Sequence, residues 1–212
     1  MRLSHTMLSR IAVFICLTLS SVSWAKEVQI ETGVLSVDVL HKGEALEIKR
    51  NQNRKAKIMR FYQDTWRGKI QPLEPFKPHP VETLAELEVI DYIEQISNGD
   101  DSIIVVDSRP SSAVLITGMI PTAVRITSEM FLNPEVQDEV FAMLGIVEPD
   151  DSVKLDFSQA KTIVAYCNGF WCGKSPRLIR TLLAFDYPAE KIKYYRGGMQ
   201  AWRSVGLTTV QP

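Results

Sequence analysis

The fold is decided by the stretch Thr162-Ile163-Val164-Ala165-Tyr166-Cys167-Asn168-Gly169-Phe170-Trp171-Cys172-Gly173-Lys174-Ser175-Pro176. Its first five residues form an apolar run, which is typical of a strand covered on both faces of a parallel sheet. Pro176 is favoured at the first position of a helix and predicts a helix over 176–185. The order of strand, loop and helix therefore places the loop at a helix N-terminus.

Strands and helices alternate on both sides of this stretch. Short apolar runs predict strands at 102–106, 161–166 and 191–195, and further helices are expected at 134–144 and 199–205. The run Thr83-Leu84-Ala85-Glu86 has the spacing of a capping box and predicts a helix that ends at Asn98-Gly99. This alternation is the mark of an α/β fold in which helices flank a parallel sheet.

The chain before this part has a different pattern. Alternating apolar residues over 33–48, interrupted by His41-Lys42-Gly43, predict a hairpin of two short strands. Four prolines stiffen residues 70–80 as a linker, namely Pro72, Pro75, Pro78 and Pro80. We therefore expect a small, mainly β N-terminal region at 26–69, the linker at 70–80 and the α/β domain at 81–212.

Residues 1–25 have the pattern of a signal peptide. The first ten residues contain Arg2 and Arg10 and no acidic residue, and an apolar stretch follows at 11–19. Ser23-Trp24-Ala25 then resembles a signal-peptidase site. We expect an exported protein, located in the periplasm, whose mature chain starts at Lys26. No later segment has the apolar length of a membrane span.

Composition and charge exclude several classes of protein. The formal net charge of the whole chain is -1, so no global positive field is available to hold a nucleic acid. Residues 49–69 hold eight basic residues and one acidic residue. This indicates a docking site for an anionic protein partner or for the acidic remainder of the same protein, or else a solvated surface. The three cysteines form no zinc-binding pattern, and we expect neither a metal ion nor a cofactor.

Cys167 is the candidate nucleophile. It follows the strand at 161–166 and precedes a helix N-terminus, whose field is expected to lower the pKa of a thiol. The mature histidines, His41 and His79, lie before the α/β part, so activation is expected from loop amides and Lys174 rather than from a Cys-His pair. The alternative is that Cys167 is a buried apolar residue at a strand end.

Two common loop motifs fit poorly. The glycines Gly169 and Gly173 are separated by three residues, whereas the phosphate-binding P-loop requires four. The run Trp171-Cys172-Gly173-Lys174-Ser175-Pro176 resembles a thioredoxin site whose second cysteine is Ser, but too little chain follows it to complete that fold. We therefore expect neither nucleotide binding by this loop nor a thioredoxin fold.

Four segments together resemble the rhodanese-like domain family across 81–210. Val105-Val106-Asp107-Ser108-Arg109-Pro110 resembles the family's early strand and Asp-x-Arg turn, and Thr117-Gly118-Met119-Ile120-Pro121-Thr122-Ala123-Val124 resembles its Gly-His-Ile-Pro-Gly-Ala segment. Tyr195-Arg196-Gly197-Gly198-Met199-Gln200-Ala201-Trp202 resembles the closing Gly-Gly-x-x-x-Trp motif. The loop after Cys167 is the fourth segment.

The resemblance implies a sulfurtransferase. Cys167 would accept a sulfane sulfur from a small sulfur-containing anion as a persulfide, and would pass it to a thiol or to cyanide. The substrate would be held by the loop residues Asn168, Gly169, Phe170, Trp171, Cys172, Gly173, Lys174 and Ser175, with Lys174 supplying positive charge. Asp107 and Arg109 would support the turn or meet the substrate. Ser175 would either cap the following helix or hydrogen-bond the sulfur, and capping is the favoured role.

This chain also departs from the family pattern. Active members commonly carry Arg five residues after the cysteine, where this chain has Cys172, and Met119 and Thr122 replace the family's His and Gly. Cys172 is either a resolving thiol that attacks a persulfide on Cys167 or a residue that only fills the loop. A dithiol redox protein, a non-catalytic binding module and a phosphatase therefore remain alternatives.

Overall fold

The computed structural model describes residues 27–66, 68–149 and 154–212, so the predicted signal peptide lies outside the described residues. Five parallel strands form the central sheet in the order β3-β7-β6-β4-β5. The strands are β3 (Glu82–Leu84), β4 (Ile103–Asp107), β5 (Val124–Arg125), β6 (Thr162–Tyr166) and β7 (Ile192–Tyr195). The predicted parallel sheet flanked by helices is confirmed.

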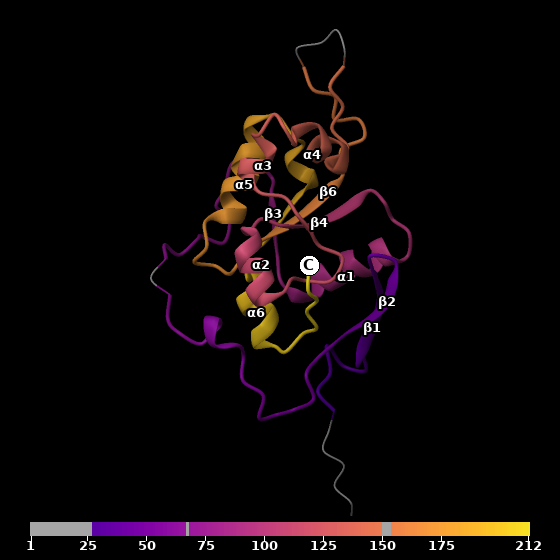
Figure 1. Cartoon of the computed structure of the whole chain (residues 1–212), viewed down its shortest axis with the longest axis vertical. Helices are drawn as coiled ribbons and strands as arrows, with labels where there is room; N and C mark the ends of the chain where they lie inside the picture. Colours follow the sequence, from indigo (N-terminus) through magenta and orange to yellow (C-terminus); the bar gives the residue numbers. More distant parts are fainter. Residues whose placement is uncertain (1–26, 67, 150–153) are drawn as a thin grey trace, which may run out of the picture.

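Helices cover both faces of this sheet (Figure 1). One face packs against α1 (Glu86–Ser97), α2 (Ser111–Thr117) and α6 (Gly198–Ser204), and the other against α3 (Ser128–Phe131), α4 (Gln137–Leu144) and α5 (Lys174–Ala184). Successive strand residues point to opposite faces, so Val164 of β6 joins the first core whereas Ile163 and Ala165 join the second. Because both faces of the sheet are buried, apolar residues follow one another along such a strand instead of occupying only every second position.

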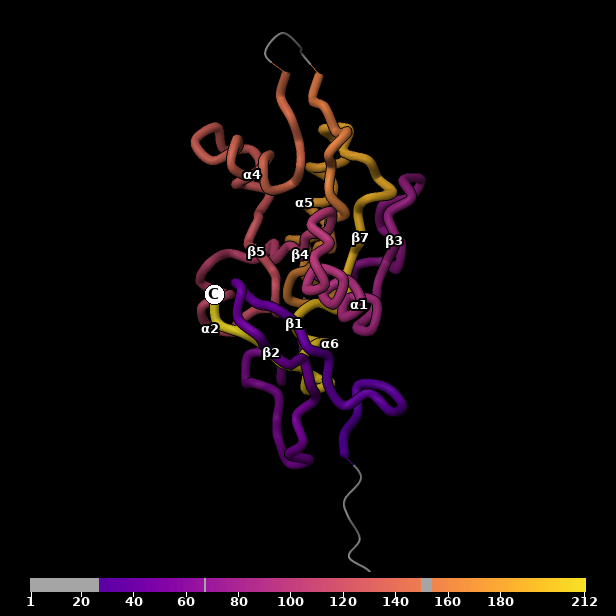
Figure 2. Tube along the Cα trace, turned by 90° about the vertical axis from the view of Figure 1, so that its right-hand side faces the viewer, coloured from indigo at the N-terminus to yellow at the C-terminus, as the bar shows by residue number. Residues whose placement is uncertain are grey.

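The N-terminal hairpin packs against the same core. Strands β1 (Ser36–His41) and β2 (Glu44–Lys49) pair antiparallel, and Lys42 and Gly43 both have positive φ angles, as a tight hairpin turn requires. The predicted hairpin and its turn are confirmed. Figures 1 and 2 both place the hairpin beside α1, and Val39 and Ile48 are buried in the core that α1 shares. The division of the chain into separate domains stays a prediction.

Several predicted boundaries are wrong. Thr83 does not cap α1, because it lies in β3, where its hydroxyl donates to the carbonyl of Leu73. The cap is instead formed two residues later, where the Glu88 carboxylate accepts the N–H of Ala85 at 3.0 Å. Helix α5 begins at Lys174, two residues before Pro176. Two short 3-10 helices, η1 (Arg60–Tyr62) and η2 (Ala189–Lys191), complete the described elements.

The carboxyl ends of three neighbouring strands define the edge where the loop lies. Strand β4 ends at Asp107, β6 ends at Tyr166 beside Cys167, and β7 ends at Tyr195 just before the glycine pair Gly197-Gly198. In open parallel sheets, ligands bind at this edge. None of the helices in the described ranges has the length and apolar character needed to cross a bilayer.

Candidate active site

Both cysteines of the loop are buried next to each other as free thiols. Cys167 is 2% exposed and Cys172 is 7% exposed. The Sγ of Cys167 lies 3.5 Å from the carbonyl oxygen of Cys172, and the two thiols share a hydrogen bond that shifts the pKa of both. The loop therefore presents a close dithiol pair rather than a single cysteine.

The pKa of Cys167 is opposite to the prediction. Burial, followed by the hydrogen bond to Cys172, raises the pKa of the Cys167 thiol well above its ordinary value. The pKa of Cys172 is instead lowered to about 6, chiefly by the hydrogen bond from Cys167 and then by the backbone N–H groups of Lys174 and Asn168. The prediction that Cys167 has a lowered pKa is wrong, because Cys172 is the thiol that the structure favours as thiolate.

Ser175 contacts the sulfur instead of capping the helix. Its hydroxyl donates a hydrogen bond to the Sγ of Cys167 at 3.1 Å, and its backbone N–H also stabilises a thiolate on Cys167. The N-cap of α5 is Gly173, one residue before the helix begins. Ser175 therefore acts on the candidate nucleophile directly, and the capping prediction is wrong.

Lys174 takes part in an exposed ion pair. Its ammonium group lies 3.9 Å from the carboxylate of Glu129, which also pairs with Arg177 at 2.9 Å. The positive charge of Lys174 still contributes to the low pKa of Cys172, but as the last of the causes. Among the described residues the loop's stabilising groups are thus mainly N–H and hydroxyl dipoles rather than a charged side chain.

The tight glycine at the start of α6 supports the loop. Gly198 has a φ of 55°, and a Cβ at this position would collide with the carbonyl oxygen of Cys167 and lie 2.8 Å from the nitrogen of Gly169. The N–H groups of Met199 and Gln200 donate to the carbonyls of Cys167 and Asn168 at 3.0 and 2.8 Å. Gly198 therefore lets the start of α6 approach the backbone of the loop closely.

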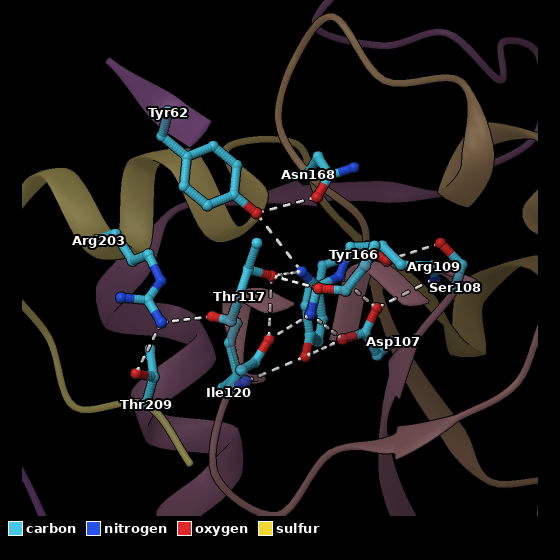
Figure 3. Close-up of polar contacts among 12 residues, drawn as sticks. Tyr62, Asp107, Ser108, Arg109, Thr117, Ile120, Tyr166, Asn168, Arg203 and Thr209 are labelled. Carbon is cyan, nitrogen blue, oxygen red and sulfur yellow. Dashed lines mark hydrogen bonds and ion pairs between the residues drawn. The ribbon is translucent and has the colours of Figure 1, made fainter. Parts of the chain in front are cut away.

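Asp107 and Arg109 form a buried brace below the loop (Figure 3). The guanidinium of Arg109 binds both carboxylate oxygens of Asp107, at 2.8 and 2.5 Å, and both side chains are fully buried. Arg109 also donates to the Thr117 hydroxyl at 2.6 Å and to the Gly118 carbonyl at 2.7 Å, while Tyr166 donates to Asp107 at 2.8 Å. These partners satisfy the pair, so its role is to support the turn.

A segment of the N-terminal region covers the loop, which the sequence did not predict. We call residues 60–66 and 68–71 the covering segment. The hydroxyl of Tyr62 donates to the Asn168 side chain at 2.9 Å and accepts from Arg109 at 3.4 Å, so it joins the loop to the buried brace (Figure 3). The ring of Trp66 stacks on that of Trp171 with centroids 3.9 Å apart.

Further contacts extend this cover along the loop. The N–H of Gln71 donates to the carbonyl of Phe170 at 2.8 Å, and a Cβ on Gly68 would lie 2.5 Å from the carbonyl oxygen of Trp171. Phe170 is 40% exposed, with the Arg196 guanidinium 5.4 Å from its ring centre. Trp171 is therefore partly buried under the N-terminal region, whereas Phe170 is open to solvent.

Thr122, which stands where the resembled family has glycine, has a positive φ angle. Its φ is 65°, a left-handed conformation that glycine adopts more readily. The N–H of Thr122 donates to Nδ1 of His41 at 3.1 Å, so the hairpin binds this turn directly. The His41 contact is structural, and it lies on the N-terminal region that packs against the domain.

The family is shown by comparison with known proteins. The family model described as "Rhodanese-like domain" matches residues 89–205, which is more than half of the chain. The chain therefore belongs to the rhodanese-like domain family. A search of curated proteins finds no match.

Two solved structures are similar in fold. The crystal structure of the BH2092 protein from Bacillus halodurans is 22% identical with a TM-score of 0.41, and the match covers 58% of this chain and 72% of that one. The protein RPA3614 from Rhodopseudomonas palustris, described as of unknown function and a possible tyrosine phosphatase, is 22% identical with a TM-score of 0.40. This second match covers 61% of this chain and 84% of that one.

The pKa of Cys172 predicts a thiolate near neutral pH. We expect the ultraviolet absorbance of thiolate in the folded protein to rise with a midpoint near pH 6. Because this pKa is below the ordinary thiol value, the stability it contributes is lost as the pH falls through about 6. Cys172→Ser should remove the transition, and Cys167→Ala should move it to higher pH, because alanine removes the side-chain donor that is the main cause of the low pKa. A midpoint at the ordinary thiol value would contradict this.

Trp66→Ala is expected to open the covering segment. The lost ring stack with Trp171 amounts to about 0.5–1.5 kcal/mol, so the rate of thiol alkylation by iodoacetamide should rise by about 2- to 10-fold. Leu115→Ala, which shortens an exposed apolar side chain on α2, is the control and should leave the rate unchanged. An unchanged rate in Trp66→Ala would show that reagents reach the thiols without movement of this segment.

Proposed function

We propose that this protein is a sulfurtransferase that carries a sulfane sulfur on Cys167 and transfers it to a thiol or to cyanide. The observation that supports it most is the hydrogen bond from Ser175 to Cys167, at the carboxyl end of β6 and the start of α5. Loop N–H groups, which also face these sulfurs, favour negative charge on a sulfur held there. The family contains sulfurtransferases, which agrees with this proposal.

The proposed reaction has two steps that balance. The thiolate of Cys167 attacks the outer sulfur of thiosulfate, the sulfur–sulfur bond of thiosulfate breaks, and sulfite leaves with the electron pair of that bond. An acceptor thiolate or cyanide then attacks the outer sulfur of the Cys167 persulfide, and Cys167 leaves as a thiolate. No net oxidation or reduction of the protein occurs.

Cys172 supplies the base that this reaction needs. Burial keeps Cys167 protonated, so its proton has to leave as it attacks. Cys172 shares a hydrogen bond with Cys167 and has a pKa of about 6, so at neutral pH it is a thiolate that can accept this proton. Cys172 thus takes the role of general base that a histidine has in a Cys-His pair.

Substrate access requires the covering segment to move. Both sulfurs are buried, and the aromatic stack between Trp66 and Trp171 lies over the loop. We propose that movement of residues 60–66 and 68–71 admits the donor and then the acceptor. Closing again would exclude water from the persulfide.

A second candidate is a dithiol redox protein. It is favoured by the hydrogen bond between the thiols of Cys167 and Cys172, since neighbouring thiols can join as a disulfide. In that reaction the two thiols would lose two hydrogens to a disulfide of a partner, which would be reduced to two thiols. An oxidising compartment would favour the disulfide. We propose that the protein is exported to the periplasm, because residues 1–25 have the pattern of a signal peptide.

The experiment that separates these functions is mass spectrometry of the reduced protein after exposure to thiosulfate. Sulfur transfer predicts a gain of one sulfur, found by fragmentation on Cys167. Exposure to oxidised glutathione is the parallel treatment, and a loss of two hydrogens there without any gain of sulfur from thiosulfate would favour the redox function. No change in either treatment would overturn both.

A further inference from the structure

A groove separate from the loop lies where the basic stretch at residues 49–69 meets the end of α6. Its volume is about 870 Å³, and it is bounded by residues 49–54 and 56–59 on one side and 203–209 on the other. Val28 also lines it, so the groove is formed by parts of the chain that are distant in sequence. The thiols and the covering residue Trp66 are not among its lining residues.

The charges around this groove have one sign. Five basic side chains line it, and none of the described lining residues is Asp or Glu; the five are Lys49, Arg50, Arg54, Lys57 and Arg203. Lys49 pairs with the exposed Glu47, which is outside the lining, at 2.6 Å. A concave surface with charges of one sign concentrates ligands of the opposite sign.

Two of the guanidinium groups are held in place by neutral acceptors. Arg50 donates from Nε to the carbonyl of Val205 at 2.6 Å and from Nη1 to that of Gln29 at 3.2 Å. Arg203 donates to the Thr117 carbonyl and, at 3.1 Å, to the Thr209 hydroxyl (Figure 3). These bonds fix the side chains without neutralising their charge.

The hydrogen bonding of Arg203 is incomplete among the described residues. Its Nε is buried and has no hydrogen-bond partner among the described residues. Burial and the nearby charge of Arg109 lower the pKa of Arg203, whereas Arg109 itself is neutralised by Asp107. A partly buried cation without a counter-charge is unfavourable, and an anion brought into the groove would relieve it.

We propose that this groove binds an acidic peptide segment of a partner protein. Carboxylates match the planar fork of a fixed guanidinium, and several cations spread along the groove suit a chain of carboxylates better than a single small anion. Apolar side chains between the cations, including Ile58, Val205 and Leu207, would contact the peptide's methylene groups. This proposal is independent of the sulfur chemistry.

The test uses the full mature chain and a fluorescein-labelled oligoglutamate peptide, followed by fluorescence anisotropy. Lys57→Glu should weaken binding by about 5-fold or more, because it reverses one exposed charge at the groove. Lys55→Glu is the matched control, since Lys55 is exposed two residues away but does not line the groove. Sulfur transfer should be unchanged in both variants.

Other outcomes would overturn the proposal. Equal weakening by Lys57→Glu and Lys55→Glu would show that only diffuse charge attracts the peptide. Displacement of the peptide by an equal concentration of inorganic sulfate would identify a small-anion site. Equal binding of a labelled oligoglutamine peptide, or salt-sensitive self-association in sedimentation without peptide binding, would also reject an acidic peptide as the occupant.

Discussion

Cys167→Ser is expected to lower the rate of sulfur transfer from thiosulfate by about 1,000-fold or more, because the hydroxyl of serine cannot form a persulfide. The substitution is nearly isosteric at a site that is 2% exposed, so the fold should be retained. The measurement is the initial rate of thiocyanate formation with cyanide as acceptor. A rate within a few-fold of the unchanged protein would reject Cys167 as the sulfur carrier.

Cys172→Ser is the matched variant and separates three roles of that residue. If Cys172 is the base, the rate falls, but the loss becomes smaller as the pH rises and Cys167 ionises without help. If Cys172 is a resolving thiol, this variant accumulates persulfide on Cys167 and releases no sulfide. If it only fills the loop, neither the rate nor the pH profile changes.

Asp107→Asn is expected to lower the free energy of unfolding by about 3–5 kcal/mol, because it leaves the guanidinium of Arg109 buried without a counter-charge. Arg109 is fully buried, and its carbonyl and hydroxyl acceptors are neutral groups. The measurement is urea unfolding followed by tryptophan fluorescence.

The control for this variant is Asp91→Asn, on the exposed side of α1, which should change the unfolding free energy by less than about 0.5 kcal/mol. A loss in Asp107→Asn of about 1 kcal/mol or less, the size of an exposed ion pair, would show that water reaches Arg109. Sulfur transfer at low temperature should persist in the part of the protein that stays folded.

The sequence predicted the central sheet well because its signals are local. The apolar runs that became β4, β6 and β7 are buried on both faces, and the loop after Tyr166 carries its glycines and cysteines in one segment. Strands β3 and β5 were missed because they have only three and two residues, too few for a periodic pattern. The helices α2 and α3 are also short, at seven and four residues.

The sequence predicted which residues form the candidate site, but not the direction in which the pKa of Cys167 is shifted. The position of Cys167 follows from the strand and the loop, whereas its raised pKa follows from burial and from Cys172. The roles of Ser175 and Lys174 depend on where each side chain points, and residue spacing does not determine this. Tyr62 and Trp66 were missed because they lie about a hundred residues before the loop, in a stretch noted only for its charge.

The covering segment has a consequence for how this protein can vary through evolution. The family model begins at residue 89, yet Tyr62, Trp66 and Gln71 all precede it and contact the loop between Cys167 and Cys172. Recombination that joined this rhodanese-like domain to a different leader region would separate the loop from the residues that pack on it. The loop and the segment therefore form one packing unit, and a change at Trp171 is expected to disturb the packing of Trp66 as well.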